Sequence, residues 1–385
     1  MDQLSQRLSR FPQSAISEMN VLAEQTHAIN LASGFPDFDP PQAIIEAAIQ
    51  ALRQGYNQYA HPAGSFRLRQ ALAAKQARFS GLNLNAEEHI TITCGGTEAM
   101  LTTLAAVINP GDRILVFSPF YENYAADIHL LDGIPVFIPL RPPHFQINQD
   151  ELIQEVQKGV KALIVCNPAN PSGKVFNEEE LKFIADLAQE HGFYVITDEV
   201  YEHIVFEPHQ HIYFSALPGM FDHCITIGSL SKTYAITGWR LGYIIANQKI
   251  TQAVQKVHDY TTLGTAAPLQ EAAIVGLNFP EMYYQNLRQE YTNLRDIFLS
   301  YLDQAGLKYI PPQGAYFVLV DISDLGFSDD WAFCRWLAKE IGVAAVPGSS
   351  FFHEPINHLV RFNFAKSPTT MHEAGARLLK IKEKI

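Results

Sequence analysis

The chain has 385 residues, 47% of them hydrophobic and 18% charged, so it is long enough for two or three buried cores and too apolar for an intrinsically disordered chain. Its 28 Lys and Arg are outnumbered by 40 Asp and Glu, and the formal charge of -12 at pH 7 disfavours nucleic acid and anionic membranes as partners. Four widely spaced cysteines without a Cys-x-x-Cys pair, and no apolar stretch of about 18 residues, predict a soluble cytoplasmic protein with neither a zinc site nor a disulfide framework.

The N-terminal segment of roughly 40 residues has few periodic apolar runs and is rich in Pro and Gly over 34–41, so we expect it to lie across the surface of another part of the molecule. From about residue 89 to about 246, short β-branched runs alternate with amphipathic stretches, as in strands joined by crossover helices. The expected strands are 90–93, 113–117, 135–140, 162–166, 193–197, 224–228 and 241–246. Most of them are almost entirely apolar, which predicts an α/β fold with a sheet covered on both faces.

A helix is predicted over 178–191, with Asn177 as its N-cap and Gly192 as its C-terminal stop. Beyond Pro280 the pattern changes to a long helix over 281–304, an aromatic strand over 315–321, a helix over 329–341, a strand over 359–364 and a last helix from Thr370. We therefore expect an N-terminal segment, 1–44, that joins a small α+β domain at 281–385, and a large domain at 45–280.

The common nucleotide-binding patterns are absent or incomplete. No Gly-x-Gly-x-x-Gly follows a strand, and the GSLSKT stretch at 228–233 lacks the second glycine of a P-loop. Cys94-Gly95-Gly96-Thr97-Glu98 instead stands where a strand ends and a helix begins, so its backbone N–H groups are suited to an anion such as phosphate. A plain tight turn explains the same five residues equally well.

Polar side chains follow several of the expected strands, at the sheet edge where α/β proteins bind ligands. The stretch NPANPSG at 167–173 is expected to project Asn170 outward from the carboxyl edge of the sheet, although a structural turn explains its prolines equally well. Asp198 with Tyr201, and Ser229 with Ser231 and Lys232, follow two further strands. A lone lysine after a strand is usually solvated. Lys232 lies among small and apolar residues, however, and partial burial would leave a neutral amine that can form an imine.

These residues resemble the fold-type-I pyridoxal-phosphate aminotransferases of class I, and the resemblance covers nearly the whole chain. The matching motifs are GFPDF at 34–38, YAHPAG at 59–64 before LR at 68–69, NPANPSG at 167–173, DEVY at 198–201, SLSK at 229–232, GWR at 238–240 and VRF at 360–362. Within that family the chain is most similar to the methionine and kynurenine or glutamine aminotransferases, in PQGAYF at 312–317, GVAAVP at 342–347 and FNFAK at 362–366. The resemblance implies a large domain with a mostly parallel seven-stranded sheet between helices and a smaller α+β domain.

The resemblance also implies roles for the polar residues, with pyridoxal 5′-phosphate (PLP) as the cofactor. Lys232 would hold PLP through an imine and then carry a proton between the substrate Cα and the cofactor, while Asp198 would pair with the pyridine nitrogen. The remaining cofactor contacts would be Asn170 and Tyr201 at the phenolic oxygen, Tyr121 against the ring, and Gly95, Gly96, Thr97, Ser229, Arg240 and a partner subunit's Tyr59 at the phosphate. Arg361 would bind the substrate α-carboxylate beside Gly34 and Asn170, whereas Tyr124 is expected in the cavity wall.

The substrate side chain is expected to be neutral. Dicarboxylate-specific relatives use a second arginine of the partner subunit in the region that corresponds to 258–268, and this stretch contains none. The leading hypothesis is a cytoplasmic homodimeric aminotransferase that moves the amino group of methionine, glutamine or an aromatic amino acid to a 2-oxo acid. A cysteine-S-conjugate or cystathionine β-lyase on the same fold needs the same lysine and remains an alternative. A non-enzymatic PLP-binding sensor would need a basic DNA-reading extension, which residues 1–40 do not offer.

Overall fold

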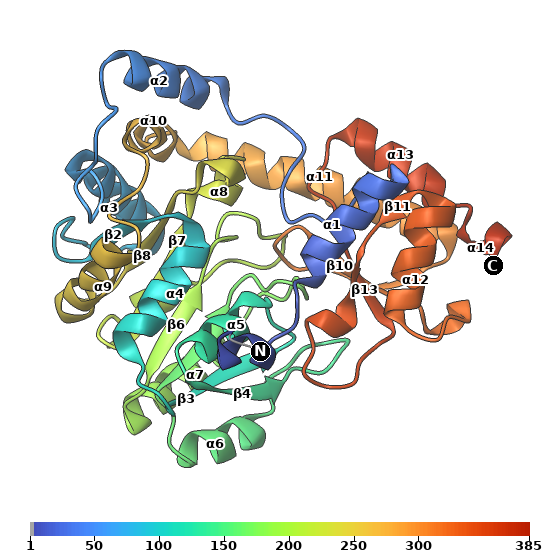
Figure 1. Ribbon diagram of the computed structural model, residues 1–385, viewed down its shortest axis with the longest axis horizontal. Helices are drawn as coiled ribbons and strands as arrows, with labels where there is room; N and C mark the ends of the chain where they lie inside the picture. Colours follow the sequence, from blue (N-terminus) through green and yellow to red (C-terminus); the bar gives the residue numbers. More distant parts are fainter. Residues whose placement is uncertain (1–3) are drawn as a thin grey trace.

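The computed structural model describes residues 4–385 and contains a large sheet and a smaller sheet with their helices (Figure 1). The large sheet has seven strands in the order β2 (Ile90–Thr93), β8 (Gly242–Ile245), β7 (Cys224–Ser229), β6 (Tyr194–Asp198), β5 (Ala162–Cys166), β3 (Arg113–Ser118) and β4 (Ile134–Pro139). Only β8 runs against its neighbours. The mostly parallel seven-stranded sheet expected from the sequence is confirmed, with strand ends shifted by at most one residue.

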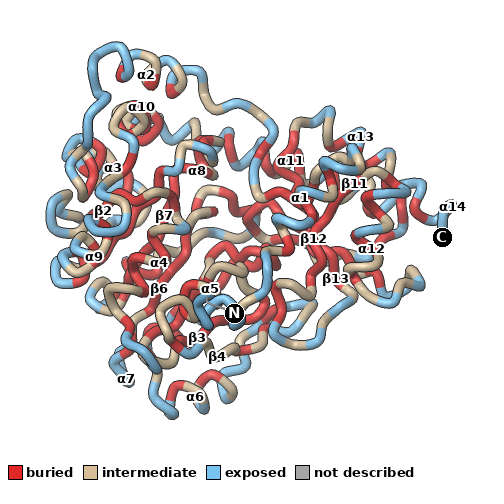
Figure 2. The backbone as a smooth tube through the Cα atoms, in the orientation of Figure 1, coloured by how far each residue is buried: buried red, intermediate tan, exposed pale blue. Residues whose placement is uncertain are grey.

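Both faces of the large sheet are covered, because successive side chains of a strand point to opposite faces. On β3, Ile114 and Val116 belong to a core with α4 (Gly95–Val107), α5 (Asn123–Leu130) and α9 (Gln248–Thr261). Leu115 and Phe117 belong to a second core with α6 (Gln149–Gln157) and α7 (Glu178–His191). The buried strands and the exposed outer turns of the helices are visible in Figure 2.

Helix α7 forms as the sequence predicts. The Asn177 side chain accepts a hydrogen bond from the Glu180 amide while the Glu180 carboxylate accepts one from the Asn177 amide, so each residue caps the other. Gly192 ends the helix at φ +71°, in the left-handed region that favours glycine. The other helices of this part are α2 (Gln42–Arg53), α3 (Phe66–Ser80), α8 (Leu230–Thr233) and α10 (Ala267–Leu277).

The smaller sheet is antiparallel, in the order β12 (Val346–Pro347), β13 (Leu359–Asn363), β10 (Phe317–Asp321) and β9 (Lys308–Ile310). Its helices are α11 (Glu281–Ala305), α12 (Asp330–Trp336), which continues as a π-helix over Leu337–Ile341, α13 (Pro368–Leu378) and α14 (Ile381–Lys384). The expected strand over 315–321 begins two residues late, because Ala315 adopts φ +58°. The expected helices from 329 and 370 begin at Asp330 and Pro368, after N-caps at Asp329 and Ser367.

The N-terminal segment is more regular than its sequence suggests. Helix α1 (Ala15–Thr26) and strand β1 (Ile29–Asn30) were not expected, and β1 pairs in parallel with β11 (Val343–Ala344). The buried stripe of α1 consists only of Ala15, Met19 and Ala23, which is too narrow to stand out as a periodic apolar run. Within residues 4–385, no helix is long and apolar enough to cross a membrane.

Candidate active site

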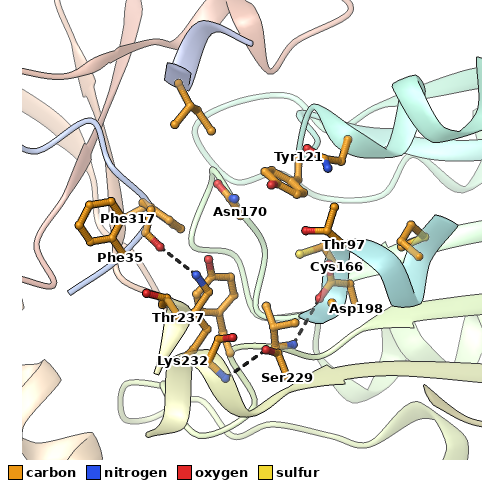
Figure 3. Close-up of a pocket in the computed structure, with 18 of the residues that line it drawn as sticks. Phe35, Thr97, Tyr121, Cys166, Asn170, Asp198, Ser229, Lys232, Thr237 and Phe317 are labelled. Atoms are coloured by element: carbon orange, nitrogen blue, oxygen red, sulfur yellow. Dashed lines mark hydrogen bonds between the residues drawn. The ribbon is translucent and has the colours of Figure 1, made fainter. Parts of the chain in front are cut away.

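A cavity of about 600 Å³ lies at the carboxyl ends of β5, β6 and β7, between the large sheet, the small sheet and the segment around Gly34. In Figure 3, Lys232 and Ser229 lie on one side of the cavity, and Tyr121 and Asn170 lie on the other. This is the sheet edge at which the sequence places its polar strand ends.

Lys232 is presented by a short turn of helix directly after β7. The Ser229 hydroxyl begins that helix by accepting a hydrogen bond from the Ser231 amide at 3.1 Å. The Lys232 Nζ donates to the Gly34 carbonyl at 2.8 Å and lines the cavity. Burial, with a further contribution from the positive charge of Arg240, lowers the pKa of Lys232 to about 8. A substantial fraction of this amine is therefore neutral near pH 8 and can act as a nucleophile.

Asp198 is the last residue of β6, and its carboxylate faces the cavity. Its Oδ1 accepts from the Val200 amide at 3.3 Å, and its Oδ2 accepts from the Tyr124 hydroxyl at 2.5 Å. Burial raises the pKa of Asp198, whereas the hydrogen bond from Tyr124 favours the ionised form. Tyr124, expected in the cavity wall, is therefore also a partner of Asp198.

Arg361 of β13 is completely buried at the opposite side of the site. Its Nη1 donates to Asn170 Oδ1 at 2.9 Å, and its Nη2 donates to the Ala32 carbonyl at 3.0 Å. The guanidinium lies 4.3 Å from the ring centroid of Phe317 and 4.6 Å from that of Phe351, and burial lowers its pKa to about 10. Arg361 thus remains a cation at neutral pH and is held in one orientation, facing the cavity.

The start of α4 forms a cradle together with Arg240. Gly95 adopts φ +80°, and a Cβ at this position would lie 2.3 Å from the Arg240 Nη2, so only glycine leaves room for the guanidinium. Gly96 and Thr97 line the cavity at the helix N-terminus, and the buried Ser231 Oγ has no hydrogen-bond partner. The amides at the start of α4, the free Ser231 hydroxyl and the Arg240 cation are suited to bind a phosphate group. Lys232 is suited to react with the aldehyde of PLP, and Asp198 is suited to pair with its ring nitrogen. The residues present therefore fit this cofactor.

Most of the predicted site residues line this one cavity: Gly34, Gly96, Thr97, Tyr121, Asn170, Asp198, Tyr201, Ser229, Lys232, Arg240 and Arg361. Two do not. Gly95 lies behind the Arg240 guanidinium, and Tyr59 is 86% exposed on a separate groove with residues 264–268.

Sequence reasoning named Ser231 among the polar residues at the strand ends but gave it no role, although it lines the cavity. It missed three further residues near the site. The Tyr316 hydroxyl donates to the Gly34 carbonyl at 2.7 Å, and Ile16 and Asn20 line the cavity from α1. Tyr316 lies in the PQGAYF stretch, which belongs to the resemblance but has no predicted role in the site. Nothing in the local sequence marks Ile16 or Asn20, because the packing of distant segments brings them to the site.

Comparison with known proteins gives consistent matches over nearly the full length. The sequence pattern of the family described as aminotransferase class I and II matches residues 26–378. The methionine aminotransferase of Escherichia coli (strain K12) is 37% identical, covering 96% of this chain and 97% of that protein. The kynurenine–oxoglutarate transaminase of Dictyostelium discoideum is 35% identical, covering 98% and 96%. A solved structure of an Escherichia coli protein with methionine aminotransferase function superposes with a TM-score of 0.94 at 36% identity, covering 98% of this chain and 99% of that one.

Proposed function

Because the chain belongs to the class I and II aminotransferases, whose cofactor is PLP, we propose that it moves the amino group of a neutral amino acid to a 2-oxo acid in two half-reactions. The proposed donors are methionine, glutamine and aromatic amino acids, kynurenine included. The observation that carries this proposal is the convergence of Lys232, Asp198 and Arg361 on one cavity.

Lys232 is the proposed catalytic residue. Bound PLP supplies the electron sink for the electron pair that remains when the substrate Cα loses its proton. The Lys232 Nζ would hold the cofactor, and its free amine would serve as the base that takes the proton from the substrate Cα and as the acid that returns it. The Gly34 carbonyl, which accepts from Nζ, holds the amine at the cavity wall.

The other polar residues bind and orient. Asp198 holds a proton on the pyridine nitrogen, which strengthens the sink, and Tyr201 and Asn170 hydrogen-bond the phenolic oxygen. Tyr121 covers one face of the ring. The phosphate is bound by Ser229, Ser231, Arg240 and the amides at the start of α4, Gly95 to Thr97. The fork of Arg361 binds the α-carboxylate beside Gly34 and Asn170.

The charged residues that line the cavity support a substrate with a neutral side chain. Among the described residues that line it, the cations are Lys232, Arg240 and Arg361, and each has a role in the scheme above. The rest of the wall includes Ile16, Phe35 and Phe317, which are apolar. The side-chain carboxylate of a substrate such as aspartate would lose its hydration in this cavity without gaining a cationic partner. Burying an unpaired polar group costs on the order of 2–7 kcal/mol, and burying an unpaired charge costs more.

We also propose a cytoplasmic homodimer in which Tyr59 reaches the neighbouring site. Tyr59 is 86% exposed and lines a groove formed by residues 57–59 and 264–268. Tyr260 and Leu263, which precede the second groove segment in the sequence, are 88% and 42% exposed. Exposed aromatic and apolar side chains of this kind support a contact surface here. Sedimentation of the active protein as a monomer would contradict the shared site.

We also propose that the chain divides into an N-terminal segment, 1–44, a large domain, 45–280, and a small domain, 281–385. This division is supported by helix α1 of the N-terminal segment, whose buried residues share a core with the small sheet.

The test of function is a comparison of amino donors with one common 2-oxo acid. Methionine, glutamine and phenylalanine should each give a higher kcat/KM than aspartate, and every amino group lost should appear on the acceptor. Release of pyruvate and ammonia in place of a paired amino acid would indicate a β-lyase. A higher kcat/KM for aspartate would contradict the neutral cavity while leaving the aminotransferase activity standing.

A further inference from the structure

The hydrogen bond between Tyr124 and Asp198 suggests a role for Tyr124 that rests on the proposed function and goes beyond it. Tyr124 lies in the first turn of α5 with 2% of its surface exposed, and its hydroxyl oxygen is 2.5 Å from Asp198 Oδ2. Burial, followed by the neighbouring charge of Asp198, raises the pKa of Tyr124 well above its usual value, so the hydroxyl keeps its proton. An ionised carboxylate only accepts hydrogen bonds, and Tyr124 is therefore the donor.

Each oxygen of the Asp198 carboxylate has a different partner. Oδ1 is held by the Val200 amide in the loop after β6, and Oδ2 is held by Tyr124 from the helix α5. Two donors on two elements fix the plane of the carboxylate at the cavity edge. Cys166, the register partner of Asp198 on β5, also lines this edge of the cavity.

A buried carboxylate needs such donors to stay ionised. Burial penalises the charged form and raises the pKa of Asp198, and the hydrogen bonds from Tyr124 and Val200 together with the charge of Lys232 counteract part of this penalty. A hydrogen bond to a charged group is stronger than one between neutral groups. The Val200 bond is long at 3.3 Å, so the 2.5 Å bond from Tyr124 is the stronger of the two.

We propose that Tyr124 is a positioning residue that keeps Asp198 ionised and aimed at the pyridine nitrogen of PLP. Its hydroxyl then sets both the affinity for the cofactor and the strength of electron withdrawal during catalysis. Tyr124 touches Tyr121 edge to face, with ring centroids 5.8 Å apart, so the aromatic ring must be retained when the hydroxyl is tested.

The test replaces Tyr124 by Phe, with Tyr284→Phe as the matched control. Tyr284 is also buried, and its hydroxyl bonds Tyr234 at 2.8 Å outside the cavity. Apoprotein is titrated with PLP by fluorescence, and kcat and KM for methionine are measured on the loaded protein. Tyr124→Phe should weaken PLP binding about tenfold or more and lower kcat by a similar factor, with KM changed less than about threefold. Tyr284→Phe should bind PLP as the wild type does.

A double-mutant cycle separates positioning from a general loss of structure. If Tyr124 acts through Asp198, the change Tyr124→Phe has little further effect on PLP affinity in an Asp198→Ala background. An equal loss in both backgrounds, or an affinity within about twofold of wild type for Tyr124→Phe alone, overturns the proposal. Failure of the wild-type protein to bind PLP would remove the proposed function as well, so the two failures are distinct.

A second substitution covers the case in which Tyr124→Phe does not fold. Incorporating 3-fluorotyrosine at position 124 keeps the ring and the hydroxyl but makes the hydroxyl a stronger donor. PLP should then bind more tightly than in the wild type, and an unchanged or weaker affinity would contradict the role of the donor.

Discussion

Replacing Arg361 by Lys tests how the substrate carboxylate is recognised, because the change keeps the charge and removes the planar fork. The Arg361 guanidinium is fully buried between two aromatic rings, and its terminal nitrogens already donate to Asn170 and to the Ala32 carbonyl. A lysine ammonium cannot reproduce both of these contacts and a paired contact to a carboxylate. The substrate therefore loses at least one charge-assisted hydrogen bond, worth about 1.5–3 kcal/mol, and kcat/KM for methionine should fall roughly 10- to 150-fold.

The assay compares methionine with 3-(methylthio)propylamine, the same molecule without its carboxylate. Arg361→Lys should lower kcat/KM for methionine while leaving that for the amine within about twofold, because the amine has no group for the fork to bind. Arg377→Lys is the matched control, since Arg377 bonds Glu373 and the Gly342 carbonyl outside the cavity. A kcat/KM for methionine within about threefold of wild type, or an equal loss with both substrates, would refute the assignment of Arg361.

Borohydride reduction of the PLP-loaded protein should place the pyridoxyl group on Lys232 and not on Lys366, and peptide mapping distinguishes the two. Burial also lowers the pKa of Lys366 to about 8, but this residue does not line the cavity. Asp198→Ala should lower kcat by about 10³-fold, or ~4 kcal/mol, while the adduct on Lys232 still forms, and a loss of less than about tenfold would contradict its role. Capture of PLP by the apoprotein should accelerate as the pH rises through about 8, because the neutral amine of Lys232 is the nucleophile. A stopped-flow rate that does not change across this range would be inconsistent with the lowered pKa.

The large sheet and the residues at its carboxyl edge could be predicted because their signals are local. Short runs rich in apolar and β-branched residues mark β5, β6 and β7 in the sequence, and the polar residues at or just after the end of each strand must lie at the sheet edge. Asn170, Asp198 and Lys232 therefore reach one cavity for reasons visible in the sequence. Sequence periodicity alone does not indicate Arg361, which lies within a strand of the second sheet; only the resemblance to a known family marked it.

Contacts between distant segments could not be predicted in the same way. Lys232 and Gly34 are 198 residues apart, and Arg361 and Ala32 are 329 apart, so these hydrogen bonds depend on where the N-terminal segment packs. The same holds for Ile16, which reaches the cavity from a helix whose narrow apolar stripe gave no periodic signal. The site therefore combines residues at strand ends, which the sequence indicates, with residues that only the packing of distant segments brings to the cavity.

A buried network behind the site shows why the loop after β6 can present two functional side chains at fixed positions. Glu202, one residue after Tyr201, bonds the Tyr213 hydroxyl at 2.8 Å and the Tyr243 hydroxyl at 3.0 Å, and it forms an ion pair with Lys75. Burial is the largest single influence and would raise the pKa of Glu202, but the charge and the hydrogen bond of Lys75, together with smaller contributions from neighbouring groups, lower the pKa, so the carboxylate stays ionised. Removing one partner of such a pair leaves an unpaired buried charge, which costs about 3–5 kcal/mol. The loop is therefore anchored on the side away from the cavity, and Asp198 and Tyr201 at its start can face the cavity without having to stabilise the loop themselves.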